Sequence, residues 1–261
     1  MALLHVNFFS DVLGMAVSAD VILPEESKNL IGMKTAGGGT YRTLYLLHGL
    51  SDDQTIWQRR TSVERYVAGR NMAVVMPTTF RAWYTDMKMG GKYLTYISEE
   101  LPRVMRSFFR GMSDRREDNF IAGLSMGGYG AVKIALLHPE RFLGVASFSG
   151  VLDIGDFLRR RVDDAHRAEY EAVFGDLSAV PGSEHDIATL ARQAAGAPQR
   201  PSLYLWCGTE DPFYAQTKHA GEYLPALGYT VDYHESTGTH AWEYWDRELP
   251  HALEYFDSLR L

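Results

Sequence analysis

Cysteine is nearly absent from this sequence of 261 residues. Its one cysteine, Cys207, excludes an intramolecular disulfide and a zinc site built from several thiolates. Long apolar runs are missing as well, so we expect no transmembrane helix. Ala16–Ala19 resembles a small-residue cleavage site, but no Lys or Arg precedes it and polar residues interrupt the apolar stretch, which argues against a signal peptide. We therefore expect a cytoplasmic protein.

Positive charge is also scarce: 26 Lys and Arg stand against 33 Asp and Glu, a formal net charge of −7. An acidic surface repels phosphate groups, so we expect neither a nucleic-acid partner nor docking on an anionic membrane. The chain contains no H-E-x-x-H motif and no EF-hand loop, and Gly37–Gly39 lacks the lysine and the following helix of a phosphate-binding loop. We expect no metal and no cofactor.

The composition is that of an ordinary globular protein, with 46% hydrophobic and 23% charged residues. A chain of this size can bury roughly 70% of its surface without help from disulfides or metals. We therefore predict a single domain over residues 1–261.

Hydrophobic runs and turn residues predict eight strands. They are Val6–Ser10, Met15–Leu23, Thr43–Leu47, Met72–Met76, Asn119–Leu124, Leu143–Ser149, Ser202–Cys207 and Thr230–Ser236. The expected helices are Ser62–Gly69, Lys92–Phe109 with a kink at Pro102, Met126–Leu137, Gln216–Leu227 and Trp242–Leu259. A glycine-containing loop over 27–40 separates the second and third strands. Strands that alternate with helices indicate an α/β fold with a mostly parallel sheet.

One segment departs from this alternation. Residues 151–200 contain no buried strand, many charges, and helical stretches at Ile154–Val162 and Ala165–Phe174. The position of this segment between two core strands predicts a small helical cap inserted within the domain. Arg159–Arg161 could attract an anionic substrate, but a solvated helix face is the simpler interpretation.

The pentapeptide Gly123–Gly127 reads G-L-S-M-G and lies between a predicted buried strand and a predicted helix. This is the context of a nucleophile elbow, in which two glycines allow a sharp turn that raises the serine hydroxyl above the sheet edge. Ser125 then stands at a helix N-terminus, where the helix dipole favours developing negative charge. We predict that Ser125 is a nucleophile.

A serine nucleophile needs a base, and the base needs a carboxylate that holds its tautomer. His240 follows the last strand in a Gly-Thr-His loop, where parallel sheets place their sites. Asp211 follows the preceding strand in the same way; its neighbour Glu210 and the more distant Asp153 are competing candidates. The other histidines have structural interpretations: His5, His138, His166, His185, His219, His234 and His251. The order Ser125, Asp211, His240 is that of the α/β-hydrolases.

Two N–H donors are needed for the oxyanion of a tetrahedral intermediate. We assign one to the backbone of Met126, directly after the nucleophile, and the other to Leu50 in the loop after the third predicted strand. His48 in that loop is interpreted as a brace. Four aromatic residues are candidates for the walls of the substrate pocket, with core packing as the alternative. They are Trp57, Trp83, Tyr84 and Trp242.

These motifs together resemble the esterase-D-like hydrolases, most of all the bacterial tributyrin-esterase type. The resemblance rests on Leu46–Asp53, Trp57–Thr61, Trp83–Met87, Tyr96–Pro102 and Gly123–Gly128, and extends over roughly residues 5–258, weakest across 151–200. It implies an α/β-hydrolase fold and a carboxylesterase for short acyl chains, with the triad on Ser125, Asp211 and His240. Relatives of this type include S-formylglutathione hydrolases, feruloyl and acetyl-xylan esterases, and mycolyltransferases.

Three hypotheses follow for the activity. The first is a serine carboxylesterase that acts on a small-molecule ester. The second is another enzyme with the same residues: an acyltransferase, a carbohydrate esterase or an S-formylglutathione hydrolase, although the last type usually has a different loop where this chain reads His48-Gly49-Leu50. The third is an inactive hydrolase fold that serves as a binding module, against which the complete triad argues. A homo-oligomer is compatible with each.

Overall fold

The structure is a computed structural model that describes residues 1–29, 31–32 and 35–259. Residues 30, 33 and 34 of the loop expected over 27–40, and the last two residues of the expected domain, lie outside the described residues. No helix in the described part of the chain has both the length and the apolar composition needed to cross a membrane.

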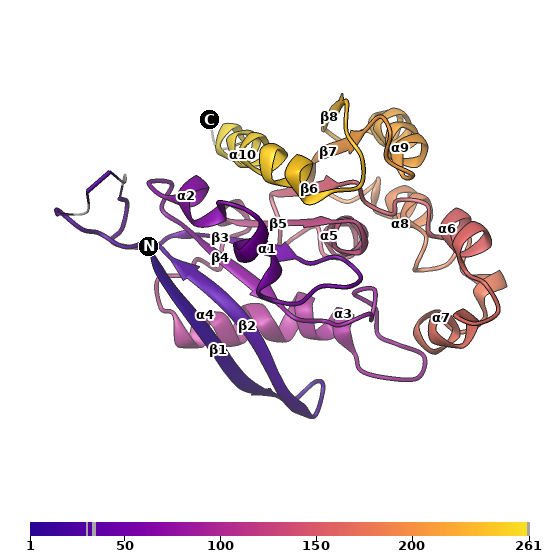
Figure 1. Cartoon of the computed structure of the whole chain (residues 1–261), viewed down its shortest axis with the longest axis horizontal. Coiled ribbons are helices and arrows are strands. Elements are labelled where there is room, and N and C mark those ends of the chain that lie inside the picture. Colours follow the sequence, from indigo (N-terminus) through magenta and orange to yellow (C-terminus); the bar gives the residue numbers. More distant parts are fainter. Residues whose placement is uncertain (30, 33–34, 260–261) are drawn as a thin grey trace.

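An eight-stranded sheet with the order β1-β2-β4-β3-β5-β6-β7-β8 forms the centre of the molecule (Figure 1). Its strands are β1 Ala2–Ser10, β2 Met15–Leu23, β3 Arg42–Leu47, β4 Met72–Pro77, β5 Asn119–Leu124, β6 Gly144–Phe148, β7 Ser202–Gly208 and β8 Val231–Ser236. β1 pairs with β2, and β2 with β4, in antiparallel fashion, while all other pairs are parallel. The predicted α/β class and all eight predicted strands are confirmed. The carboxyl ends of β3 to β8 therefore meet at one edge.

Helices cover both faces of the sheet. They are α1 Ile56–Arg60, α2 Val63–Val67, α3 Tyr93–Thr95, α4 Leu101–Phe108, α5 Met126–Leu137, α6 Ile154–Arg161, α7 Arg167–Phe174, α8 Ile187–Ala194, α9 Tyr214–Ala226 and α10 Trp242–Ser258, with 3₁₀ turns at Arg116–Asp118 and Leu177–Ala179. Strand β5 illustrates the two hydrophobic layers: Ile121 packs into the layer under α5, whereas Phe120 and Ala122 pack into the layer under α10. Such alternation is the pattern of a strand buried on both faces.

The helix expected over Lys92–Phe109 is interrupted. It begins at Tyr93, passes through a π-helical turn at Tyr96–Glu100, and continues as α4 with Pro102 in its first turn. Proline lacks an N–H and crowds the preceding turn, and a π-turn is one way in which a helix accommodates this. The buried Glu100 carboxylate at the end of this turn accepts the Asp11 N–H at 2.8 Å and thereby anchors the turn between β1 and β2.

Segment 151–200 contains α6, α7 and α8 and, among its described residues, no strand. α8 packs on α5, and the ribbon places α6 and α7 at the end of the molecule opposite the β1–β2 hairpin (Figure 1). The stretches expected at Ile154–Val162 and Ala165–Phe174 correspond to α6 and α7. α8 was not predicted, although Asp186 caps it by accepting the Ala188 N–H at 3.0 Å, an N-cap signal visible in the sequence.

Candidate active site

The nucleophile elbow forms between β5 and α5. Ser125 has φ 53° and ψ −117°, a strained conformation for a residue with a side chain. A Cβ at Gly123 would lie 2.4 Å from the carbonyl of Gly127, and a Cβ at Gly127 would lie 2.5 Å from the carbonyl oxygen of Leu47. Only glycine fits at these two positions, as the motif indicates.

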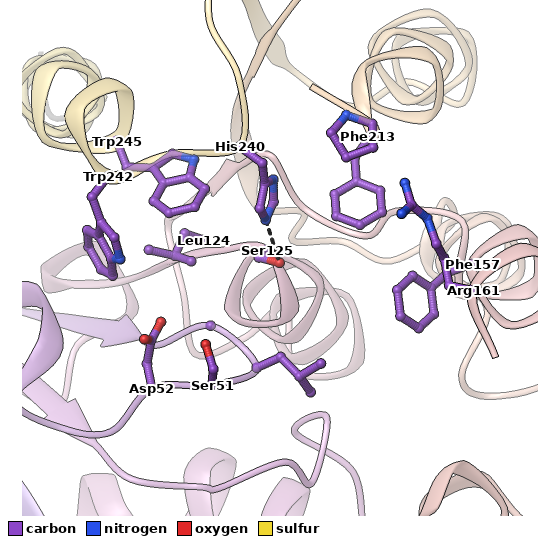
Figure 2. A pocket seen from close by; sticks show the side chains of 13 residues that line it. Ser51, Asp52, Leu124, Ser125, Phe157, Arg161, Phe213, His240, Trp242 and Trp245 are labelled. Atoms are coloured by element: carbon purple, nitrogen blue, oxygen red, sulfur yellow. Dashed lines mark hydrogen bonds between the residues drawn. The ribbon is translucent and has the colours of Figure 1, made fainter. Parts of the chain in front are cut away.

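The three residues predicted as a triad form one hydrogen-bonded chain. The Nε2 atom of His240 lies 3.0 Å from Ser125 Oγ (Figure 2), and its Nδ1 atom lies 2.8 Å from Asp211 Oδ2. The Asp211 side chain is completely buried, and its other oxygen accepts the Phe213 N–H at 2.8 Å. Because the carboxylate can only accept, Nδ1 of His240 carries the proton and Nε2 is left to accept the serine hydroxyl.

Two aromatic rings fix the plane of His240. Phe213 meets its imidazole edge to face at 5.2 Å and 83°, and Trp245 meets it at 4.8 Å and 84°. The Trp245 indole is itself held by a hydrogen bond from Nε1 to Ser149 Oγ at 3.1 Å. The imidazole therefore has little freedom to leave the line between Ser125 and Asp211.

The competing acids have other roles. The exposed Glu210 accepts the Gly238 N–H at 2.5 Å, and Asp153 caps α6 by accepting the Asp156 N–H at 2.8 Å. Each is held in its own backbone interaction, whereas Asp211 alone among the three is hydrogen-bonded to His240.

His48 braces the loop after β3, as expected. Its Nε2 accepts the Thr79 N–H at 3.0 Å, so Nδ1 carries the proton that it donates to the Gly49 carbonyl at 2.6 Å. Burial lowers the pKa of His48 to about 4, which keeps the ring neutral. Next to this brace, Leu50 lines the cavity above Ser125, and Met126 is the first residue of α5.

The expectation that Trp57, Trp83 and Tyr84 line the pocket is wrong. All three are at most 1% exposed. The Trp57 indole N–H donates to the Leu47 carbonyl, and the Tyr84 hydroxyl donates to the His48 carbonyl, each at 2.9 Å. Trp57 and Tyr84 therefore support the loop after β3 from beneath. The expectation failed because a position near the sheet edge in sequence does not tell whether a side chain points into the cavity or under it.

Trp83 lies behind the cavity wall, where its ring packs 4.9 Å from that of Phe157. Of the four aromatic candidates, only Trp242 lines the cavity. It stacks edge to face on Trp57 at 5.2 Å. Of the aromatic residues that line the cavity, Trp242 was therefore predicted from the sequence, but Phe157, Phe213 and Trp245 were not. The other three candidates lie behind this lining.

The cavity around Ser125 has a volume of about 460 Å³. Its lining residues are Gly49, Leu50, Ser51, Asp52, Leu124, Ser125, Phe157, Arg161, Pro212, Phe213, His240, Trp242 and Trp245. Figure 2 shows Trp242, Trp245 and Asp52 on one side of Ser125, with Phe157, Phe213 and Arg161 on the other. Trp245 could have been found from its i,i+3 spacing to Trp242. Arg161 stands out in the sequence only within the Arg159–Arg161 cluster, for which a solvated helix face is the simpler interpretation, and Phe157 has no signal beyond its place in segment 151–200.

The cavity contains one carboxylate besides the triad. Asp52 is half-buried, and this burial raises the pKa of its carboxyl group, with a smaller opposing effect from the Gly49 N–H. Within residues 1–29, 31–32 and 35–259, no group of three or more His, Cys, Asp or Glu side chains is arranged as a metal site.

A serine above the carboxyl edge of a parallel sheet, linked through histidine to a buried aspartate, is the arrangement of a serine hydrolase with the α/β-hydrolase fold. The chain matches the model of the family described as "Putative esterase" over residues 10–256 and belongs to this family. It is a carboxylic ester hydrolase.

Three relatives illustrate this membership. An acetyl esterase of Caldicellulosiruptor saccharolyticus is 29% identical over 267 residues, which cover 99% of either chain. The fluorophosphonate-binding serine hydrolase F of Staphylococcus aureus is 34% identical, with a TM-score of 0.87 over 98% of both chains. An S-formylglutathione hydrolase from the same organism is 33% identical, with a TM-score of 0.84 over 98% of both chains.

Proposed function

We propose that this protein is a serine carboxylesterase that hydrolyses esters of short acyl chains, with Ser125 as nucleophile, His240 as general base and acid, and Asp211 as the residue that orients His240. The observation that carries the proposal is the hydrogen-bonded chain from Asp211 through His240 to Ser125, which ends in an open cavity. A fold alone would not support a function; this chain of contacts does.

The reaction proceeds through an acyl-enzyme. Ser125 Oγ attacks the ester carbonyl while His240 Nε2 takes the hydroxyl proton. The tetrahedral intermediate then expels the alcohol, which receives that proton from His240. Water then attacks the acyl-enzyme while His240 removes a proton from the water. The carboxylic acid leaves as His240 returns this proton to Ser125 Oγ. Ser125 and His240 end each cycle as they began it.

Two backbone N–H groups stabilise the oxyanion in this proposal. Met126 lies at the start of α5, where N–H groups have no intrahelical acceptor and the dipole favours negative charge. Leu50 supplies the second N–H from the braced loop after β3. The buried contacts of Trp57, Tyr84 and His48 to this loop keep it rigid, which is what preorganised stabilisation requires.

The size and walls of the cavity favour small acyl groups. Phe157, Phe213, Trp242 and Trp245 enclose Ser125 on two sides. The helical segment 151–200 contributes Phe157 and acts in this proposal as a cap. The acetyl esterase among the relatives acts, by its name, on an acyl group of this size.

S-formylglutathione hydrolysis is the second candidate, because a relative with that description covers 98% of this chain. Formyl is the smallest acyl group, so the same cavity accepts it. The two candidates differ in the leaving group, which is a thiol in one case and an alcohol in the other. A comparison of S-formylglutathione with ethyl and nitrophenyl acetates therefore separates them by kcat/KM.

The proposal is tested by labelling the protein with a fluorophosphonate probe and locating the adduct by mass spectrometry. We expect the label on Ser125 and its complete loss in Ser125→Ala, with unchanged circular dichroism. Ester hydrolysis should fall by several orders of magnitude in the same variant. Label on another residue, or near wild-type turnover in folded Ser125→Ala, would refute the assignment.

A further inference from the structure

We propose that Arg161 makes this enzyme selective for esters that carry a carboxylate a few bonds from the scissile carbonyl. This inference rests on the proposed function and adds to it a substrate class. Arg161 ends α6 and lines the same cavity as Ser125. Among the described residues that line the cavity, it is the one whose side chain carries a permanent positive charge.

Arg159, Arg160 and Arg161 are all exposed, and their ion-pair partners distinguish Arg161 from the other two. Arg159 and Arg160 both form ion pairs with Asp156, at 3.4 Å and 2.7 Å. The Arg161 guanidinium forms no ion pair or hydrogen bond with any residue in the described part of the chain. Two of the three basic residues thus have partners on their own helix, and the third extends into the cavity without one.

The surroundings of Arg161 strengthen its attraction for an anion. Its side chain is exposed overall, but Figure 2 shows it on the same side of Ser125 as Phe157 and Phe213, which line the cavity with it, so apolar surface borders part of its environment. A guanidinium presents a planar fork of N–H donors that matches the two oxygens of a carboxylate. The partner it lacks in the protein is therefore supplied by the substrate.

The opposite wall of the cavity carries the opposite charge. Asp52 lies across Ser125 from Arg161 and repels a carboxylate from that side. The cavity is thus polarised from Asp52 to Arg161, and this polarity orients an anionic substrate as well as binding it. A neutral ester of equal size has no such preference.

Two matched pairs of esters test the inference. The first is monoethyl succinate and its counterpart in which the free carboxylate is a primary amide, which places the charge on the acyl side. The second is O-acetylglycolate and O-acetylglycolamide, which places the charge on the alcohol side. Release of ethanol or acetate gives kcat and KM for each. The pair of esters whose carboxylate preference changes when Arg161 is substituted shows whether the acyl or the alcohol portion of the substrate lies under α6.

Three variants complete the design: Arg161→Gln removes the charge, Arg161→Lys retains it without the fork, and Arg160→Gln is the control. The control removes the same charge one residue away, from a side chain already paired with Asp156. In one of the two pairs we expect Arg161→Gln to lower the preference for the carboxylate over the amide by about tenfold, mainly through KM. Arg161→Lys should lose less, and Arg160→Gln should change the preference by less than twofold.

The outcomes separate this inference from the proposed function. If neutral esters are hydrolysed and Ser125→Ala is inactive, but wild type and Arg161→Gln have equal preferences in both pairs, the selectivity inference is overturned and the esterase stands. An equal loss in Arg160→Gln would overturn it too, since it would reveal only the general field of α6. If the wild-type protein hydrolyses none of these esters, the proposed function is refuted instead.

Discussion

Ser125 and Arg161 line one cavity but belong to structural elements of different kinds. Ser125, Asp211 and His240 follow strands β5, β7 and β8 of one sheet, whose hydrogen-bonded register fixes where their loops begin. Arg161 and Phe157 lie on α6, which belongs to segment 151–200 and is held by side-chain contacts such as those of the Phe157 ring with Trp83 and Phe213. The sheet side holds its groups by backbone geometry, whereas the helical side holds them by side-chain contacts.

This difference assigns separate tasks to the two sides. Bond cleavage demands atoms placed within a few tenths of an ångström, and strand ends and a glycine-lined elbow provide that accuracy. Substrate preference tolerates a long, flexible side chain on an exposed helix. We therefore expect changes on the sheet side to affect kcat and changes on the helical side to affect KM and selectivity.

The largest effect should come from the triad acid. Asp211→Asn puts an amide where one carboxylate accepts both the Phe213 N–H and the His240 Nδ1–H, so His240 loses its tautomer control. We expect kcat to fall about 10⁴-fold. Glu210→Gln is the control, because glutamine still accepts the Gly238 N–H. A larger loss of activity in Glu210→Gln than in Asp211→Asn, measured by initial rates on one ester, would identify Glu210 and not Asp211 as the triad acid.

Acyl-chain length should have the next largest effect. Each added methylene gains about 0.8 kcal/mol by burial, but overfilling a packed pocket costs about 1–3 kcal/mol. We expect kcat/KM on nitrophenyl esters to peak between two and four carbons and to fall roughly tenfold to a hundredfold by twelve. Phe157→Ala and Trp242→Ala each remove one wall of the cavity.

The variant that shifts the peak to longer chains identifies the acyl side. A shift in Phe157→Ala would place the acyl group under α6, and a shift in Trp242→Ala would place it against α10. A wild-type maximum at eight carbons or beyond would show that neither aromatic wall limits the chain.

A smaller effect is expected beneath the oxyanion loop. Tyr84→Phe removes the hydroxyl that donates to the His48 carbonyl at 2.9 Å, and a buried hydrogen bond of this kind contributes about 1 kcal/mol. We expect kcat to fall about fivefold with KM nearly unchanged, since the loop acts on the transition state. A change confined to KM would mean that Tyr84 shapes the binding surface instead.

The last prediction concerns stability and not activity, at the contact between α5 and segment 151–200. Lys133 on α5 is buried, donates to Thr85 Oγ1 at 2.7 Å and lies 3.3 Å from His185 Nδ1 in segment 151–200. Burial lowers the pKa of Lys133 to about 7, against weaker opposing effects of Glu184 and Asp86. The unfolded chain therefore binds more protons above pH 7, so the free energy of unfolding should rise with pH there.

This rise ends at the unfolded pKa of lysine, and its slope is at most about 1.4 kcal/mol per pH unit. Lys133→Met should flatten the profile between pH 7 and 9, measured by urea unfolding. The exposed Lys28→Met serves as the control and should leave the slope unaltered. An unchanged slope in Lys133→Met would mean that this amine is solvated in both states.

Comparison of the two sides also explains where sequence reasoning succeeded. The inner strands β3 to β7 were predictable, because a strand buried on both faces is a continuous apolar run bounded by turn residues. The edge strands β1 and β8 are only partly buried, and the turn residues beside them were the additional signal. Ser125, Asp211 and His240 were predictable because each lies at or shortly after the end of a parallel strand, and parallel strands bring their carboxyl ends together. The π-turn before Pro102 was not, since proline predicts only a disturbance in the helix and not its form.

The sequence by itself determined the succession of strand, elbow and helix around Ser125 and the identity of the residues that meet there, because local periodicity and glycine requirements are properties of short segments. Only the tertiary structure decided which side chains face the substrate. Trp57 and Trp242 are both aromatic residues near the sheet edge, yet one is buried beneath the loop after β3 and the other lines the cavity. Arg161 is chemically the same as Arg160, and its place in the cavity follows from the packing of α6 side chains such as Phe157 against Trp83 and Phe213, which no short stretch of sequence encodes.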